Sequence, residues 1–162
     1  MRKPAFATLS LIALGFTAAC GEDTVASPTT PTPAAQAAVS VSVEPRPLDA
    51  QPSTDPAFQW ELRFNLTVHE SAGLGVHINN TRLTITERPS GTVVFSDRAG
   101  ADDIIAAAGT NRVEALGSLT GSIDDIRYTL PGGGRRALAT FTFQMTDDNG
   151  QDFEVTAQAR IE

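Results

Sequence analysis

The segment from Leu138 to Ile161 reads LATFTFQMTDDNGQDFEVTAQARI and decides the fold class of this chain. Its two halves, Leu138 to Thr146 and Asp152 to Ile161, alternate apolar and polar residues with a period of two. Such alternation indicates half-buried β-strands. Between them lies Asp147 to Gln151, where the Asn-Gly pair tolerates the positive φ angles of a tight turn. The segment therefore predicts an antiparallel β-hairpin.

One face of this hairpin is expected to line a hydrophobic core. Its apolar positions are Phe141, Phe143, Met145, Phe153, Val155, Ala157, Ala159 and Ile161. A sheet with one apolar face must bury that face against a second layer. The hairpin therefore predicts a two-layer domain.

Similar alternation recurs upstream. The longest run places Phe58, Trp60, Leu62, Phe64, Leu66 and Val68 on one face, and we expect it to form the central core strand. Weaker strand patterns cover Val39 to Glu44, Leu83 to Thr86, Val93 to Phe95 and Val113 to Leu119, the last broken by Gly117. The segment from Ala101 to Gly109 begins with acidic residues and ends in glycine, which predicts a short helix or turn that crosses between sheets. Together these segments predict an all-β, two-sheet antiparallel sandwich of about seven strands.

The segment from Val39 to Glu162 resembles the immunoglobulin-like and fibronectin type III-like modules of bacterial surface proteins. The features that carry this resemblance are Trp60 in an early strand and the final hairpin with its acidic Asn-Gly turn. No cysteine pair flanks the tryptophan, so an antibody-type domain is excluded. The resemblance is architectural, and function does not follow from it.

The N-terminal segment has the pattern of a signal peptide. Arg2 and Lys3 are followed by an apolar stretch from Ala5 to Phe16, which is too short to span a bilayer. The sequence Thr17-Ala18-Ala19-Cys20-Gly21 resembles the lipobox of bacterial lipoproteins. This resemblance implies removal of residues 1–19 and attachment of a diacylglyceryl group, with its fatty acyl chains (palmitate), to Cys20.

The lipobox match departs from the family at Thr17, where leucine is preferred. Cleavage by ordinary signal peptidase, giving a secreted protein, is the alternative. Gly21 stands where an aspartate often retains family members at the inner membrane, so we expect the outer membrane rather than the inner one. Residues 20–38 are rich in proline and threonine and predict an extended linker. The expected organisation is thus a signal peptide (1–19), a lipidated linker (20–38) and a β-sandwich (39–162).

Charge and residue usage exclude several functions. From Cys20 onward, ten arginines oppose nineteen acidic residues, a net charge of −9, which disfavours nucleic acid as a partner. Lys3 is the only lysine, so the processed chain has no Schiff-base or phosphate-loop lysine. Cys20 is the only cysteine, which excludes an internal disulfide. No catalytic constellation and no required cofactor is predicted.

The sequence offers two candidate metal sites. His69 and His77, with Glu70, are a possible two-histidine site, but two solvated histidines are the more ordinary interpretation. The turn from Asp147 to Asp152 crowds oxygen ligands that calcium prefers, and Asp102-Asp103 and Asp124-Asp125 could join it if the fold gathers their loops. Ordinary hairpin-turn chemistry explains the turn equally well.

The sequence hypothesis is a lipid-anchored cell-envelope protein with a non-catalytic binding or structural module. Its partners would be the membrane, through the lipid on Cys20, and an envelope protein or polysaccharide. The alternative is a calcium-dependent carbohydrate-binding or minor hydrolytic envelope protein. An exposed apolar patch would favour a protein partner, whereas a lined concave pocket would favour a small ligand.

Overall fold

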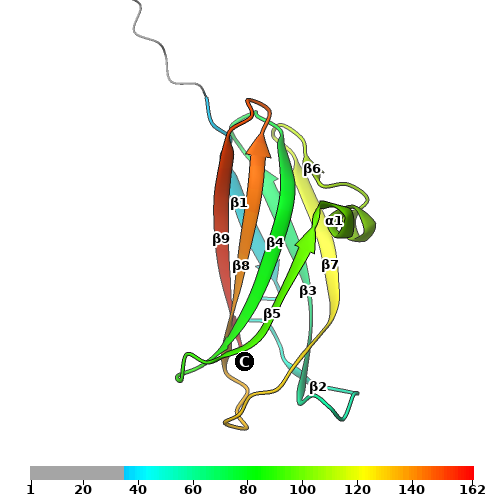
Figure 1. Ribbon diagram of the computed structural model, residues 1–162, viewed down its shortest axis with the longest axis vertical. Helices are drawn as coiled ribbons and strands as arrows, with labels where there is room; N and C mark the ends of the chain where they lie inside the picture. Colours follow the sequence, from blue (N-terminus) through cyan, green and yellow to red (C-terminus); the bar gives the residue numbers. More distant parts are fainter. Residues whose placement is uncertain (1–34) are drawn as a thin grey trace, which may run out of the picture. The chain divides into compact units, whose positions relative to one another are not determined.

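Antiparallel strands make up most of residues 35–162, the part of the chain that the computed structural model describes (Figure 1). The elements in chain order are β1 (Val39–Glu44), β2 (Gln51–Pro52), β3 (Trp60–Glu70), β4 (Val76–Glu87), β5 (Val93–Gly100), α1 (Ala101–Ala108), β6 (Arg112–Val113), β7 (Ser118–Tyr128), β8 (Ala137–Asp147) and β9 (Asp152–Ile161). Seven strands have six residues or more, and β2 and β6 have two each. The predicted all-β sandwich with one short helix is confirmed.

The strands form two sheets that pack face to face. In the first sheet β3 pairs with β7 on one edge and with β1 and β2 on the other. In the second sheet the order is β5-β4-β8-β9, and β6 continues the line of β5 along β4. Every paired strand in these sheets runs antiparallel.

The C-terminal hairpin is confirmed, and its predicted inward positions lie in the core or pack against it. β8 pairs with β9 from Ala137 opposite Ile161 to Thr146 opposite Asp152. Phe141, Phe143 and Met145 have at most 3% of their surface exposed. Gly150 has φ +76° in the turn, the conformation that the Asn-Gly pair predicted.

The central strand β3 is shorter at its start than the alternation predicted. Leu62, Phe64 and Val68 are buried, as expected. Phe58 was expected in the core, but this prediction is wrong because Phe58 lies in a turn before β3 and is 40% exposed. Trp60 is half-buried at the strand's first position, where its indole N–H donates to the Gly134 carbonyl (3.0 Å).

The strand predicted from Val113 to Leu119 is also wrong. Val113 belongs to β6 in the second sheet, and β7 begins only at Ser118 in the first sheet. A β-bulge interrupts β7, because Ile123 pairs with Phe64 and Ile126 with Leu62. Three residues on β7 thus span two on β3, and both isoleucines face inward. The bulge breaks the period-two pattern that marks a strand in sequence.

The predicted short helix is confirmed as α1, on the path from β5 in the second sheet to β7 in the first. The Asp103 carboxylate accepts a hydrogen bond from the Gly100 N–H at the start of the helix (2.9 Å). Gly109 ends the helix with φ +80°. The helix packs against β4, β5 and β7.

The two lateral sides of the sandwich differ. On one side β1 contacts β9, and Leu48 bonds to Arg160 and Glu162 through the backbone, which closes the sandwich. On the other side β5 and β7 are both sheet edges, and α1 is the element that lies over them (Figure 1). The helix therefore covers part of the only lateral opening between the two sheets in the described residues.

Candidate ligand-binding site

The strand register identifies which side chains face the opening between β5 and β7. Thr81 pairs with Ala99 and Leu83 with Asp97, on the inner face of the second sheet. Leu66 pairs with Gly121 on the inner face of the first sheet. Residues that pair directly across strands point to the same face of a sheet. The opening is therefore lined by residues from both sheets.

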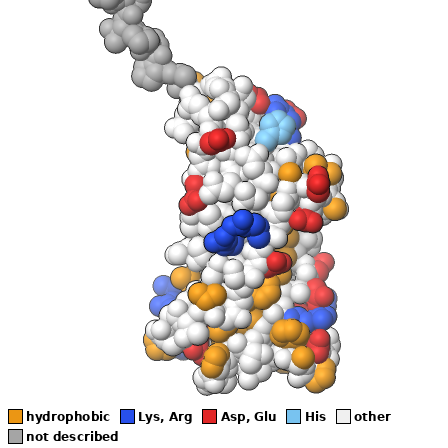
Figure 2. All heavy atoms as spheres, in the orientation of Figure 1, with side chains coloured by type: hydrophobic (Ala, Val, Ile, Leu, Met, Phe, Trp, Pro, Cys, Tyr) orange, Lys and Arg blue, Asp and Glu red, His pale blue; other side chains and the backbone are white. Residues whose placement is uncertain are grey.

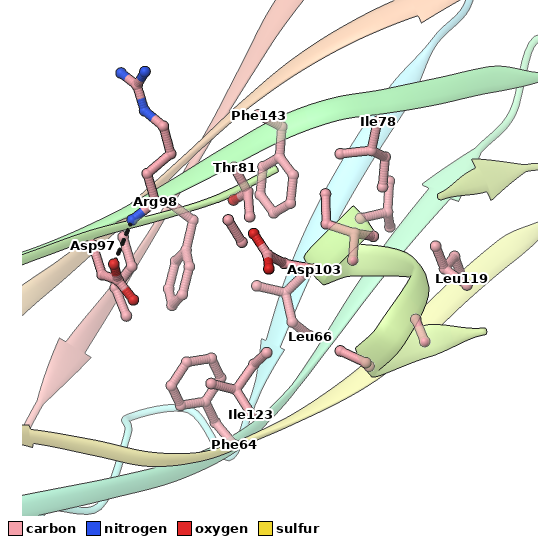
Figure 3. Close-up of a pocket in the computed structure, with 18 of the residues that line it drawn as sticks. Phe64, Leu66, Ile78, Thr81, Asp97, Arg98, Asp103, Leu119, Ile123 and Phe143 are labelled. Carbon is pink, nitrogen blue, oxygen red and sulfur yellow. Dashed lines mark hydrogen bonds between the residues drawn. The ribbon is translucent and has the colours of Figure 1, made fainter. Parts of the chain in front are cut away.

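These inner faces enclose a pocket of about 190 Å³ beneath α1 (Figure 3). Its lining comes from β3, β4, β5, β7, β8 and α1. Phe64 and Phe141 pack edge to face at its base, with ring centroids 5.4 Å apart. A protein cavity of about 150 Å³ can hold one benzene molecule. The pocket therefore has room for one ring or for a short alkyl chain.

Small residues leave this space open. Ala99, Ala107, Ala108 and Gly121 all line the pocket, where larger apolar residues would fill it. A Cβ atom placed on Gly121 would lie 3.9 Å from the Ala108 Cβ, so α1 and β7 approach closely at this point. The space results from side-chain size at these positions and not from a gap in the backbone.

The polar residues in the lining are Thr81 of β4, Asp97 and Arg98 of β5, and Asp103 of α1. Figure 3 shows the Asp103 carboxylate pointing toward Thr81, while the Arg98 guanidinium points away from the pocket. One oxygen of Asp97 accepts the Arg98 backbone N–H (2.8 Å), and one oxygen of Asp103 accepts that of Gly100. No ion pair to either carboxylate is found within residues 35–162. The pocket lining thus carries two carboxylates without an ion-pair partner in the described residues.

A second, more open hollow lies further along the same side. Phe58, Phe95 and Tyr128 line it together with Asp125 and Arg127. Figure 2 shows apolar side chains gathered along this side, below the helix. The Tyr128 hydroxyl is buried without a hydrogen-bond partner in the described part of the chain, and burial raises its pKa. The open side of the sandwich is therefore apolar for much of its length.

The structure does not bring the two histidines together in a metal site. His69 Nδ1 lies 3.0 Å from the Gly117 carbonyl oxygen and 3.0 Å from Ser118 Oγ. His77 Nε2 lies 2.9 Å from the Arg112 guanidinium. Within residues 35–162, no group of three or more His, Cys, Asp or Glu side chains is placed to hold a metal ion.

The carboxylates of the turn from Asp147 to Asp152 bind to other groups of the protein and do not point toward a common site. Asp147 is buried, and its Oδ1 accepts the N–H groups of Asn149 and Gln151 (both 2.9 Å). Asp148 forms a two-point ion pair with Arg112 (2.8 and 3.0 Å), which lowers the pKa of Asp148. Asp152 accepts from the Thr146 hydroxyl (2.5 Å). The two acidic pairs weighed with this turn lie elsewhere, Asp102-Asp103 on α1 and Asp124-Asp125 on β7.

Glu70 is a buried carboxylate whose role the sequence did not reveal. It is fully buried at the end of β3 and accepts four backbone N–H groups, from Ala38 (3.3 Å), Ala72 (2.7 Å), Gly73 (2.9 Å) and Leu116 (3.0 Å). Burial alone would raise the pKa of Glu70, but these donors outweigh it and lower the pKa to about 2. Glu70 is thus a structural anion.

Comparisons with known proteins show the fold and no more. No family model matches the chain, and no curated protein matches it. Northeast Structural Genomics Consortium target SoR45 superposes with a TM-score of 0.56 at 10% identity, covering 76% of this chain and 84% of that one. A Bordetella pertussis protein provisionally named ApaA superposes with a TM-score of 0.53 at 17% identity, covering 77% of this chain and 93% of that one. These neighbours support an all-β sandwich.

The predicted signal peptide, the predicted lipid attachment at Cys20 and the linker up to residue 34 lie outside the described residues. Residues 35–38, also predicted to belong to the linker, are described and form hydrogen bonds with the sandwich. Within residues 35–162, no helix is both long and apolar enough to cross a membrane.

Proposed function

We propose that this protein is a lipid-anchored cell-envelope module that binds an apolar group, without catalysis, in the pocket between β5, α1 and β7. The observation that carries the proposal is the pocket itself, which is apolar inside and lies at the open side of the sandwich. A concave apolar site with a few convergent polar groups is the usual form of a small-molecule site.

The size of the pocket sets the affinity it can supply. A group the size of one ring buries roughly 150 Å² of apolar surface. At about 25 cal/mol per Å² this burial contributes about 4 kcal/mol, so the dissociation constant is about 1 mM or weaker, because association also costs translational and rotational freedom. The pocket alone therefore gives weak binding, and a tighter ligand needs further contacts at the mouth.

The anchor and the partner remain proposals that rest on the sequence. Cys20 follows two alanines in a lipobox-like segment, and it is the sole cysteine. A tethered module of this kind meets its ligand at the envelope, as a free molecule or as a group carried by an envelope protein or polysaccharide. The acidity of the chain favours neutral or cationic partners over nucleic acid.

The test uses n-octanol as a neutral apolar probe and the full chain carrying Cys20→Ser. We expect octanol to perturb amide NMR signals in β5, α1 and β7. Gly121→Val should weaken octanol binding at least about fivefold, because the added methyl groups occupy the pocket. Valine is favoured in β-strands, so the substitution should not disrupt β7. Ser122→Val is the matched control, because Ser122 is exposed on the opposite face of β7. If Gly121→Val binds octanol as tightly as the unmodified pocket does, the proposal is wrong.

A further inference from the structure

We infer that the ligand of this pocket combines an apolar body with a positively charged head, as in an alkylammonium ion. The inference rests on the proposed function and adds the chemistry of the head group. It is carried by two carboxylates in the pocket lining, Asp97 and Asp103, and by Thr81, toward which the Asp103 carboxylate points.

The first step is the position of Asp97 in β5. It pairs with Leu83, so it shares the inner face with Phe95 and Ala99, which pair with Ile85 and Thr81. An acidic residue on the inner face of a sheet is costly unless something compensates its charge. Asp97 is exposed at the sheet edge, so water compensates it in the free protein and a ligand can reach it.

A second acid, Asp103, lines the same pocket from another element. Asp103 lies in the first turn of α1, and Figure 3 shows its carboxylate directed across the mouth toward Thr81. Its bond to the Gly100 N–H uses one oxygen, and the other oxygen has no protein donor in the described chain. Two carboxylates from separate elements thus flank one apolar opening.

The third step is the placement of the nearby cations. Arg98 pairs across the strands with Arg82 on the outer face of the second sheet, and both are exposed. The Arg98 guanidinium points away from the pocket in Figure 3. The cations of this region therefore lie outside, and the mouth remains negative.

The charge at the mouth discriminates between ligands with the same apolar body. An ammonium head would gain attraction and hydrogen bonds from Asp97 and Asp103, whereas a carboxylate head would be repelled. A fatty acid is therefore disfavoured. The competing explanation is that Asp97 only protects the edge of β5 against pairing with another chain, because inward-facing charges serve that purpose.

The experiment compares octylammonium, n-octanol and octanoate on the full chain carrying Cys20→Ser, by calorimetric or NMR titration at pH 7 and low salt. We expect octylammonium to bind at least about tenfold more tightly than octanoate, with octanol between them. Added salt should narrow the difference, because it screens exposed charges.

The variant Asp97→Asn with Asp103→Asn should remove the preference for octylammonium and leave octanol affinity unchanged. Asp103→Asn keeps an oxygen for the Gly100 N–H, and thermal melting checks that the fold is retained. Asp102→Asn is the matched control, because Asp102 is an adjacent acid of α1 that does not line the pocket. It should keep the preference.

The outcomes separate the two proposals. If all three probes bind with equal affinity, the head-group inference is wrong and the apolar site stands. If octanoate binds best, the mouth does not act as a negative site and the inference is also wrong. If none of the three binds, both the proposed function and this inference are overturned, and protection of the β5 edge explains Asp97.

Discussion

Glu70 joins three separate segments of the chain without the help of a cation. Its four donors come from the residue before β1, from the β3–β4 connection and from the β6–β7 connection. A buried anion is tolerated when hydrogen bonds replace its hydration. Glu70 therefore links these three segments through hydrogen bonds at this end of the sandwich.

We predict that Glu70→Gln lowers the free energy of unfolding by at least about 2 kcal/mol, because an amide group would face donors that need an acceptor. The stability should also depend on pH. The pKa of Glu70 is about 2 in the folded chain against an ordinary value of 4.5, so its contribution is present above pH 4.5 and is lost as pH falls toward 2. Urea denaturation at pH 7, 4 and 3 measures both effects.

The variant Glu44→Gln is the control for this prediction, because Glu44 is exposed at the end of β1. It should leave the free energy of unfolding at pH 7 nearly unchanged. The Glu70→Gln chain should lose less stability between pH 5 and 3 than the unmodified chain. An equal loss of stability in the two chains between pH 5 and 3 would show that other carboxylates cause the loss.

Trp60 and Leu62 show how far alternation identifies the core. The pattern places both on one face of β3, which is correct, but Leu62 is fully buried and Trp60 is half-buried at the end of the strand. We predict that Leu62→Ala costs about 2–5 kcal/mol of stability. Trp60→Phe should cost only about 1 kcal/mol, for the lost hydrogen bond to Gly134. Chemical denaturation compares them, and a larger loss for Trp60→Phe would contradict this ranking.

At the scale of elements, the sequence predicted those whose pattern is local and regular. The β8–β9 hairpin and α1 were predicted nearly to the residue, because turn glycines and periodicity mark their limits. The extent of β7 was not predicted, because the bulge at Asp124 and Asp125 makes two successive inward residues, Ile123 and Ile126, three positions apart instead of two. Long-range pairing with β3 fixes that bulge, and no local pattern indicates it.

The pocket could not be predicted because its lining has the same composition as a core. Its apolar residues come from six elements, and in the sequence each of these residues is indistinguishable from an ordinary core residue. The informative residue is Asp97, an acid on an inner face. Its orientation follows only from the register of β5 against β4, which the sequence did not provide.

The end of α1 can be tested through its glycine. Gly109 has φ +80°, a conformation that costs residues with a Cβ atom about 1 kcal/mol. We predict that Gly109→Ala lowers stability by about 1 kcal/mol and speeds amide hydrogen exchange in α1. Gly134→Ala is the control, because Gly134 has no positive φ and no neighbour within 4 Å of its Cβ position. Unchanged exchange in the Gly109→Ala helix would contradict this role.

At the scale of the whole molecule, the sandwich extends further toward the N-terminus than its sequence boundary at residue 39. The Ala35 carbonyl accepts a hydrogen bond from the Asn149 side chain (2.7 Å), and the Ala38 carbonyl accepts from the Ser71 N–H (2.9 Å). Ala38 also donates to Glu70. Residues 35–38 therefore belong to the same compact unit as the sandwich.

We predict that a chain starting at residue 35 melts cooperatively with a strand-type circular dichroism spectrum. A chain starting at residue 39 should be less stable by about 1–3 kcal/mol, because Glu70 and Asn149 lose partners. Thermal and urea denaturation of the two chains provide the comparison. Equal stability would place the working boundary of the domain at residue 39.

The proposed anchor also concerns the whole molecule, because it would determine where the apolar pocket meets its ligand. Each acyl CH₂ buried in a bilayer contributes about 0.8 kcal/mol, so two acyl chains on Cys20 hold a protein firmly where one would not. We predict that the unmodified chain, expressed in a bacterium that processes lipoproteins, stays with the membrane fraction after a high-salt wash. Cys20→Ser should instead be soluble or unprocessed. Fractionation and the intact mass of the mature protein are the measurements. A soluble wild-type protein with an unmodified N-terminal mass would replace the tethered module with a secreted one, whose pocket would then have to take its ligand from solution.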